Sequence, residues 1–311
     1  MNNANGKRTN GWLAFELGVL RRLKFNSAAI PFMCEPELGV YLKRWGVRVA
    51  ANDLAKWAAT KASAFIENNV ERLDESEVTE VLEDAYVPRH KLYNPALLKW
   101  FNETDSWWFD NVRQNAEKLE LPMSRAIALS LGMMVGDYAR SFTDETRELR
   151  QPLSQVFRRI WSSQMAPFDN SKANSSDNRE ARDFVAEQQT NLLFLRLPSG
   201  AGSMDQDRNS PAAWREEWIR GGDGFWDELK KAGMGRLGMG VATKQQYLRF
   251  VEDILRVALH VPVWAIAHVE DGFVPTNDLV DTINQIRKVE TIYSKDFSEL
   301  TGLRATIITA S

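Results

Sequence analysis

The chain has 311 residues, of which 44% are hydrophobic, and its formal net charge is −3. This length and apolar content suffice for a full core, either in one large α/β domain or in a core with an inserted subdomain. The slightly acidic balance excludes a protein that wraps nucleic acid with a uniformly basic surface, although it is compatible with a local basic face.

The sequence also argues against several kinds of site. A single cysteine, Cys34, excludes an internal disulfide and a cysteine-rich zinc site, and three scattered histidines make a metal centre unexpected. The N-terminal MNNANGKRTNGW lacks the apolar stretch of a signal peptide, and no uncharged run approaches the length of a membrane span. We therefore expect a soluble, cytoplasmic protein without a membrane partner.

The first 70 residues alternate between helix and strand patterns. A helical pattern, GWLAFELGVLRRLKF (11–25), precedes NSAAIPFM (26–33), which is typical of a short buried strand. An amphipathic helix ending at Gly46 follows, and VRVAAND (47–53) is typical of a second strand. A long helical pattern begins at Asp53, the last residue of this second strand pattern. This order predicts a parallel sheet with right-handed crossovers.

The middle of the chain, residues 71–182, has almost no strand pattern. It contains an acidic amphipathic stretch and two longer helical patterns, at 96–119 and 124–142. In the second of these, Gly132 and Gly136 have the spacing of a close helix contact, which we predict here. The polar segment SSQMAPFDNSKANSSDNRE, at its end, is expected to be a disordered loop.

Strand patterns resume with TNLLFLRLPSGAG (190–202), a nearly continuous apolar run that ends in a loop. Helical patterns and the strands VPVWAIAHV, ETIYS and RATIITA follow. We therefore divide the chain into the first part of an α/β core (1–70), a helical insertion (71–182) and the second part of the core (183–311). Ligands in open α/β sheets bind at the carboxyl ends of the strands.

The segment NSAAIPFMCEPELGVYLKRWGVRVAANDLAKWAATKASAFIENN resembles the first part of the DNA adenine-N6 methyltransferases, the Dam-like enzymes of the D12 class. In that family a strand leads into Phe-x-Gly-x-Gly, and a later strand ends in an acidic residue. GDYARSFTDETRELRQPLSQVFRRI is similar to the family's helical region, and TNLLFLRLPSGAG occupies the place of the strand that carries Asp-Pro-Pro-Tyr. The resemblance implies a Rossmann-like, S-adenosylmethionine-dependent methyltransferase sheet with a helical insertion.

The resemblance places the cofactor-binding positions at Phe32, Cys34, Pro36 and Asp53. The phenylalanine is kept, but Cys34 and Pro36 replace the two glycines that let the backbone pass close to the cofactor. The proline also removes an amide donor. Asp53 matches the acidic residue that would bind the cofactor ribose, and the alternative is a cap of the following helix. We expect no bound cofactor, and S-adenosylmethionine only if the protein is active.

The resemblance places the catalytic motif at Arg196, Leu197, Pro198 and Ser199. The family's aspartate accepts hydrogen bonds from the amino group of the flipped adenine, and its tyrosine stacks on the base. Arginine has no acceptor, and its charge opposes a nitrogen that becomes cationic. We therefore expect the chemistry to be lost, and we predict that Arg196 forms an ion pair with Glu35 or Glu37 across the emptied pocket.

Basic residues in the helical insertion are candidate phosphate contacts. They are Arg147, Arg150, Arg158 and Arg159. Their spacing beside Glu145 and Glu148 is equally typical of a solvated face with salt bridges.

Three functions follow from these patterns. The first is a catalytically inactive relative of the adenine methyltransferases that acts as a DNA-binding or scaffolding subunit, paired with an active methyltransferase or another protein. The second is an active adenine-N6 DNA methyltransferase with divergent motifs. The third is a protein-interaction module without DNA contact.

Overall fold

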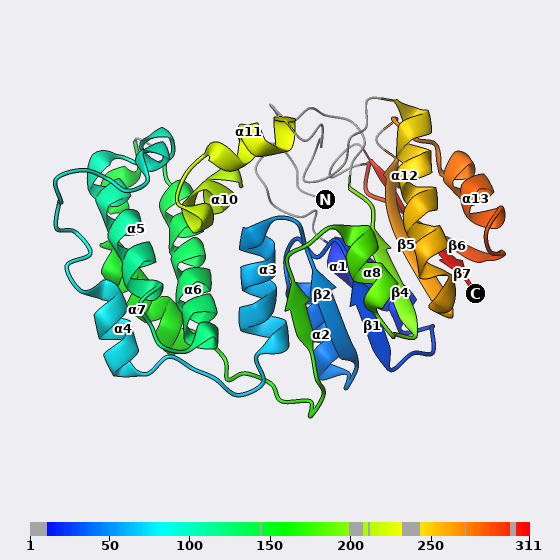
Figure 1. Cartoon of the computed structure of the whole chain (residues 1–311), viewed down its shortest axis with the longest axis horizontal. Coiled ribbons are helices and arrows are strands. Elements are labelled where there is room, and N and C mark those ends of the chain that lie inside the picture. Colours follow the sequence, from blue (N-terminus) through cyan, green and yellow to red (C-terminus); the bar gives the residue numbers. More distant parts are fainter. Residues whose placement is uncertain are drawn as a thin grey trace.

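The computed structural model describes residues 11–143, 145–198, 208–210, 212–231, 243–270, 272–298 and 303–311. These residues form a seven-stranded sheet with helices on both faces and a group of helices beside it (Figure 1). Helix α3 (Lys56–Ala62) lies between the two parts and continues into one π-helical turn, η1 (Ser63–Glu67).

The sheet has the strand order β3-β2-β1-β4-β5-β7-β6. Its strands are β1 (Ser27–Ile30), β2 (Arg48–Asn52), β3 (Ser175–Asp177), β4 (Leu192–Arg196), β5 (Val263–Glu270), β6 (Val289–Asp296) and β7 (Arg304–Ala310). The first five strands are parallel to one another, whereas β7 is antiparallel to both β5 and β6. The predicted α/β sheet with parallel crossovers is thereby confirmed, and it is compatible with a Rossmann-like fold.

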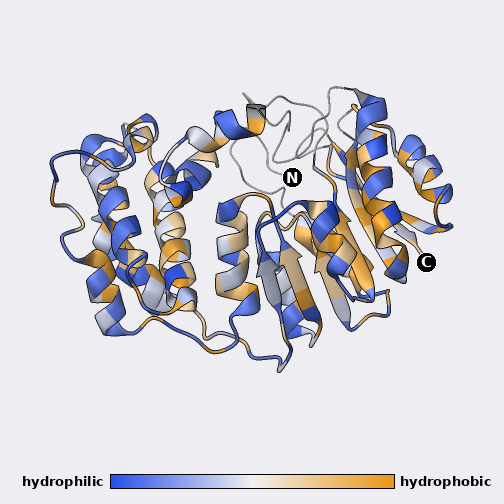
Figure 2. Cartoon of the chain, in the orientation of Figure 1, coloured by the Kyte–Doolittle hydropathy of each residue, from blue (hydrophilic) through white to orange (hydrophobic). Residues whose placement is uncertain are grey.

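Helices bury both faces of this sheet. On one face lie α1 (Trp12–Leu20) and α2 (Glu37–Arg44). On the other lie α8 (Ala181–Glu187), α12 (Lys244–Val257) and α13 (Thr276–Asn284). The central strands are the most hydrophobic part of this layer, as Figure 2 shows, because their side chains are buried on both faces.

A second core holds the helical group together. Its elements are α4 (Glu75–Leu82), η2 (Pro95–Lys99), α5 (Glu103–Ala116), α6 (Pro122–Arg140), η3 (Arg147–Leu149), α7 (Leu153–Ser163) and α10 (Ala213–Arg220). Helix α11 (Gly224–Lys231) follows α10, and a short turn, η4 (Ala258–His260), follows α12. Among the described residues, no helix has the length and apolar character that crossing a bilayer requires.

The predicted contact at the small residues of α6 is confirmed. A Cβ built on Gly136 would come within 2.0 Å of the Trp214 ring, and one on Gly132 within 2.3 Å of the Trp218 ring. Both tryptophans belong to α10 and are fully buried. The absence of a side chain at these two positions therefore lets the indole rings of α10 pack directly on the backbone of α6.

The polar segment after α7 is ordered and contributes β3, so the expectation of a disordered loop is wrong. Asparagine side chains attach this segment to the neighbouring backbone. The side chain of Asn174 accepts a hydrogen bond from the N–H of Val49 (3.0 Å), and that of Asn170 donates to the carbonyl of Val47 (2.9 Å). Because β3 is at the edge of the sheet, it needs no apolar alternation, and the sequence lacked the usual strand pattern. The segment 71–182 thus contains a strand as well as helices.

Candidate functional site

The positions matched to the methyltransferase motifs meet at the carboxyl edge of three adjacent strands. The loop containing Cys34 follows β1, Asp53 follows β2, and Arg196 ends β4. Cys34 has a left-handed backbone (φ 53°), and its N–H donates to the carboxylate of Asp53 (2.8 Å). Pro36 is the N-cap residue of α2.

Arg196 is buried and paired, but its partner is Glu16 of α1. Its Nε and Nη2 donate to the two carboxylate oxygens of Glu16, each at 2.9 Å, and its Nη1 donates to the carbonyl of Met33 (2.9 Å). Glu16 is fully buried and Arg196 is 6% exposed. This two-point geometry offsets the desolvation of both charges and ties β4 to α1 and to the loop after β1.

The predicted ion pair of Arg196 with Glu35 or Glu37 is therefore wrong. Glu35 faces the helices instead, where it pairs with Lys61 of α3 and with Arg215 of α10, the latter at 2.6 Å. Burial alone would raise the pKa of Glu35, but the two cations outweigh it and keep the pKa below its usual value. Glu37 lies in the first turn of α2.

Arg215 extends this connection to the helical group. Its Nε and Nη2 donate to the carboxylate of Asp137 on α6, at 3.0 and 2.6 Å, while its Nη1 holds Glu35. One guanidinium thus joins the loop after β1 to α6. The loop that would bind a cofactor in a methyltransferase is fixed here by side-chain ion pairs.

Asp53 is held between two backbone donors. Its Oδ2 accepts from Cys34, and its Oδ1 accepts from Ala55 (2.9 Å), the residue before α3. The first backbone N–H groups of α3, those of Lys56 and Trp57, donate to the carboxylate of Glu216 on α10, both at 3.0 Å. Asp53 therefore supports the turn into α3, whereas the helix itself is capped by a residue distant in the sequence.

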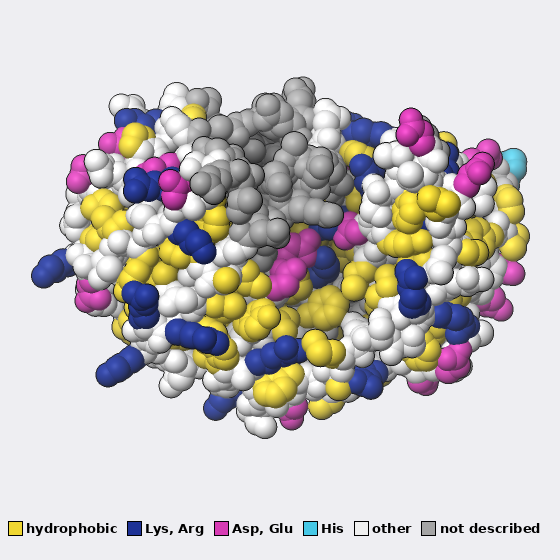
Figure 3. Space-filling model, turned by 180° about the vertical axis from the view of Figure 1, so that it is seen from behind, with side chains coloured by type: hydrophobic (Ala, Val, Ile, Leu, Met, Phe, Trp, Pro, Cys, Tyr) yellow, Lys and Arg dark blue, Asp and Glu magenta, His cyan; other side chains and the backbone are white. Residues whose placement is uncertain are grey.

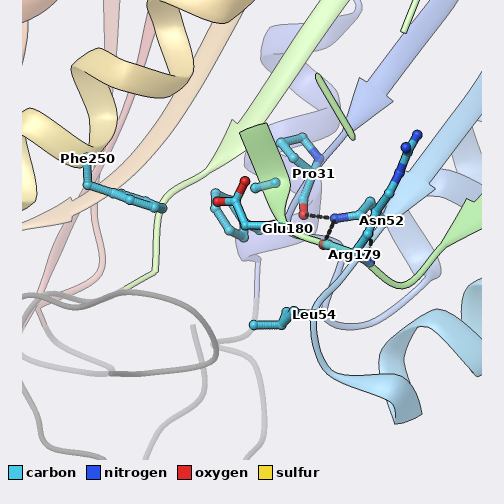
Figure 4. A pocket seen from close by; sticks show the side chains of 8 residues that line it. Pro31, Asn52, Leu54, Arg179, Glu180 and Phe250 are labelled. Carbon is cyan, nitrogen blue, oxygen red and sulfur yellow. Dashed lines mark hydrogen bonds between the residues drawn. The ribbon is translucent and has the colours of Figure 1, made fainter. Parts of the chain in front are cut away.

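One small pocket lies at the edge of the sheet among the described residues. Figure 4 shows a small pocket beside Pro31, Leu54 and Phe250, where the side chain of Asn52 donates to the carbonyls of Pro31 (3.1 Å) and Arg179 (3.0 Å). Phe32 also lines this pocket, and the centroid of its ring lies 6.1 Å from the ring centroid of Phe250. The cavity measures about 10 Å³, which is room for about one water molecule.

Two positions that the resemblance assigns to S-adenosylmethionine binding lack the backbone freedom of glycine. Cys34 carries a Cβ, and Pro36 has no amide donor. Arg196, at the end of β4, is paired with Glu16 and donates to the carbonyl of Met33 after β1, and both oxygens of Asp53 accept backbone hydrogen bonds.

Leu197 and Pro198, two further positions that the resemblance assigns to the catalytic motif, have structural contacts. The N–H of Leu197 continues the pairing with β5 by donating to Ala267 (3.0 Å), and the carbonyl of Pro198 accepts from the hydroxyl of Tyr247 (2.8 Å). Ser199 lies outside the described residues. Within the described part of the chain, no group of three or more His, Cys, Asp and Glu side chains could hold a metal ion.

The four arginines proposed as phosphate contacts separate into two pairs. Arg147 and Arg150 line a cleft of about 430 Å³ at the ends of α5 and α6, and Arg150 pairs with Asp105 (2.6 Å). Arg158 and Arg159 lie on the exposed side of α7. Arg158 pairs with Glu75, and Arg159 donates to the side chain of Gln151 (2.6 Å).

The surface carries no broad basic field on the face seen in Figure 3. Lys and Arg side chains are distributed there among apolar and acidic ones, and acidic and basic side chains lie beside each other in the hollow at its centre. Any contact with a polyanion on this face would therefore depend on local groups of cations.

Burial gives Asp53 an effect on stability that depends on pH. Desolvation raises its pKa from 3.8 to about 6, although the N–H groups of Cys34 and Ala55 oppose the shift. Between these values the folded protein binds more protons than the unfolded chain, so the contribution of Asp53 to stability falls as pH rises. We expect a decrease of about 2–3 kcal/mol between pH 4 and pH 7.

This expectation is tested by urea unfolding of the wild type and of Asp53→Asn at pH 4, 5, 6 and 7. The unfolding free energy of the wild type, relative to that of Asp53→Asn, should fall as the pH rises. Asp281→Asn, at an exposed position of α13, is the matched control and should show no such change. A wild-type-minus-Asp53→Asn difference that is constant over this range would contradict the expectation.

No protein-family model matches the sequence, and a comparison with curated proteins also finds no match.

Proposed function

We propose that the protein is a catalytically inactive relative of the DNA adenine-N6 methyltransferases that binds DNA through its helical group. The seven-stranded mixed sheet with helices on both faces is compatible with the Rossmann-like sheet that the sequence resemblance implies. The left-handed backbone of Cys34 also supports the proposal, because it is a conformation that glycine, the family's residue at this position, adopts readily.

The observation that carries the proposal is the ion pair of Arg196 with Glu16. At the place of the family's catalytic aspartate, all of the donating groups Nε, Nη1 and Nη2 are directed to protein acceptors. A guanidinium cannot accept a hydrogen bond from an adenine amino group, and it would repel the cationic nitrogen formed during methyl transfer. The ion pair stabilises the fold at a position where the family carries out its chemistry.

Binding to DNA is supported by the cations of the helical group. Arg158 and Arg159 project from the side of α7 opposite to its buried residues, and a second set of cations lines the neighbouring cleft. Contacts of this kind position a protein on the phosphate backbone without reading bases. Because the whole chain is slightly acidic, binding should be weak and strongly dependent on salt.

The proposal predicts that Arg158→Glu combined with Arg159→Glu weakens binding to duplex DNA about tenfold or more at low salt, since charge reversal adds repulsion to the loss of two contacts. Fluorescence anisotropy at several salt concentrations measures both affinity and salt slope. Loss of two phosphate contacts should reduce the magnitude of the slope by about 1.8. Arg256→Glu with Lys288→Glu, exposed positions beside the sheet, is the matched control and should bind as the wild type does.

Other outcomes would select the other functions. Wild-type affinity in the Arg158/Arg159 variant would remove α7 from the interface, and no binding by the wild type would favour a protein-interaction module. A micromolar dissociation constant for S-adenosylmethionine in calorimetry, or N6-methyladenine in DNA incubated with the protein and the cofactor, would favour a divergent active enzyme.

A further inference from the structure

The cleft in the helical group has the size of a small-molecule site. Its volume of about 430 Å³ lies within the range of roughly 300–1,000 Å³ that such sites occupy. Three separate segments form it: the end of η2 with the start of α5, the last turn of α6, and the region of η3.

The lining of the cleft is strongly cationic. Lys99, Arg140, Arg147 and Arg150 lie in it, and Asp105 is the one carboxylate among its described lining residues. That carboxylate is already paired with Arg150 (2.6 Å). Among the described lining residues, four cations thus lie beside a single carboxylate, in a chain whose overall charge is −3.

Two of these cations form no ion pair within 4 Å with a carboxylate of the described residues. Arg140 donates only to the carbonyl of Trp100 (3.3 Å), and Lys99 donates to the carbonyl of Arg208 (3.1 Å) and the side chain of Asn209 (3.2 Å). Burial and the neighbouring Arg215 lower the pKa of Arg140, against the effect of Asp137. A bound anion would supply the missing countercharge.

The cleft also offers aromatic surface and a helix terminus. Trp100, Phe101 and Phe142 line it, and the charged groups of Lys99 and Arg140 lie 4.4 and 4.9 Å from the centroid of the Trp100 ring. The 14-residue helix α5 begins there with Asn102 as its N-cap, so the positive end of its dipole faces the cleft. Cations, a helix N-terminus and flat apolar surface together suit a ligand with both phosphate and a planar ring.

We propose that this cleft binds a free nucleoside mono- or diphosphate, with the phosphate held by Arg140 and Lys99 and the base against the aromatic lining. The nucleotide contacts proposed here, Arg140 and Lys99, differ from the DNA contacts tested at Arg158 and Arg159, and they do not require the sheet edge.

The test is calorimetric titration of the full chain with AMP, ADP and, as a probe of the phosphate part alone, inorganic pyrophosphate. We expect a dissociation constant below about 100 μM for the better nucleotide and weaker binding of pyrophosphate, which lacks the ring. Arg140→Gln should weaken nucleotide binding at least tenfold. Lys99→Gln, at an exposed position where a folding defect is not expected, should weaken it about threefold to tenfold.

Lys118→Gln, exposed just after the far end of α5, is the matched control and should bind the nucleotide as the wild type does. Absence of nucleotide binding at millimolar concentration, or affinity unchanged in both cleft variants, would overturn the proposal. DNA binding is measured in the same variants. If only the nucleotide proposal is wrong, the Arg158/Arg159 variant still loses DNA affinity. If only the DNA proposal is wrong, Arg140→Gln still loses nucleotide affinity.

Discussion

Arg196→Met is expected to lower the free energy of unfolding by about 3–5 kcal/mol, the largest effect that we predict for a single substitution in this chain. The substitution leaves Glu16 fully buried without its two-point partner, and it also removes the hydrogen bond to Met33. Urea unfolding followed by circular dichroism measures the loss, provided that the slope of the transition is unchanged.

The double variant Arg196→Met with Glu16→Leu should be clearly more stable than the sum of the two single losses implies, because no orphan charge remains. Arg256→Met serves as the control for an exposed pair, since Arg256 and Glu252 on α12 lie 2.6 Å apart at the surface, and it should cost less than about 1 kcal/mol. Additive losses at Arg196 and Glu16 would show that the pair is not an energetic unit.

Gly136→Ala is expected to destabilise the protein by about 1–3 kcal/mol, although alanine is the better helix former. The new Cβ would lie 2.0 Å from the ring of Trp214. That ring cannot withdraw easily, because it is fully buried and packs on Phe101 and Phe109 with centroid distances of 5.3 and 5.7 Å. Helices α6 and α10 must therefore separate slightly, and thermal or urea unfolding measures the cost.

The matched control is Gly18→Ala in α1, where no atom of the described residues lies within 4 Å of the new Cβ. There the same change should stabilise the protein by about 0.5–1 kcal/mol through helix propensity alone. Combining Gly136→Ala with Trp214→Leu should cost less than the sum of the two changes, since the smaller side chain makes room. Wild-type stability of Gly136→Ala would contradict the packing assigned to α6.

Much of the fold could be predicted because it depends on local patterns. The apolar runs at 26–33, 47–53 and 190–196 are strands buried in the sheet, and the helical pattern between the first two is α2. The spacing of Gly132 and Gly136 predicted a close contact, although it did not identify the tryptophans of α10 as the partner. Strand β3 was missed because an edge strand held by asparagine side chains carries no apolar alternation.

The candidate site was predicted less completely. Burial and pairing of Arg196 followed from its place at the end of an apolar strand, but Glu35 and Glu37 were the wrong partners. The one signal for Glu16 was a lone acidic residue in the apolar stretch WLAFELGVL, which a surface position would explain equally well. Glu216, which caps α3 from α10, had no local signal at all.

By itself the sequence determined that the strands and helices alternate and that Arg196 stands at the end of an apolar strand, just before a loop. Only the tertiary structure decided that Arg196 meets a residue 180 positions away, and that Lys99, Arg140 and Arg147 share one cleft. Residue spacing specifies which side chains share a face of one element. It does not specify which elements meet, because that depends on how separate apolar faces pack into common cores.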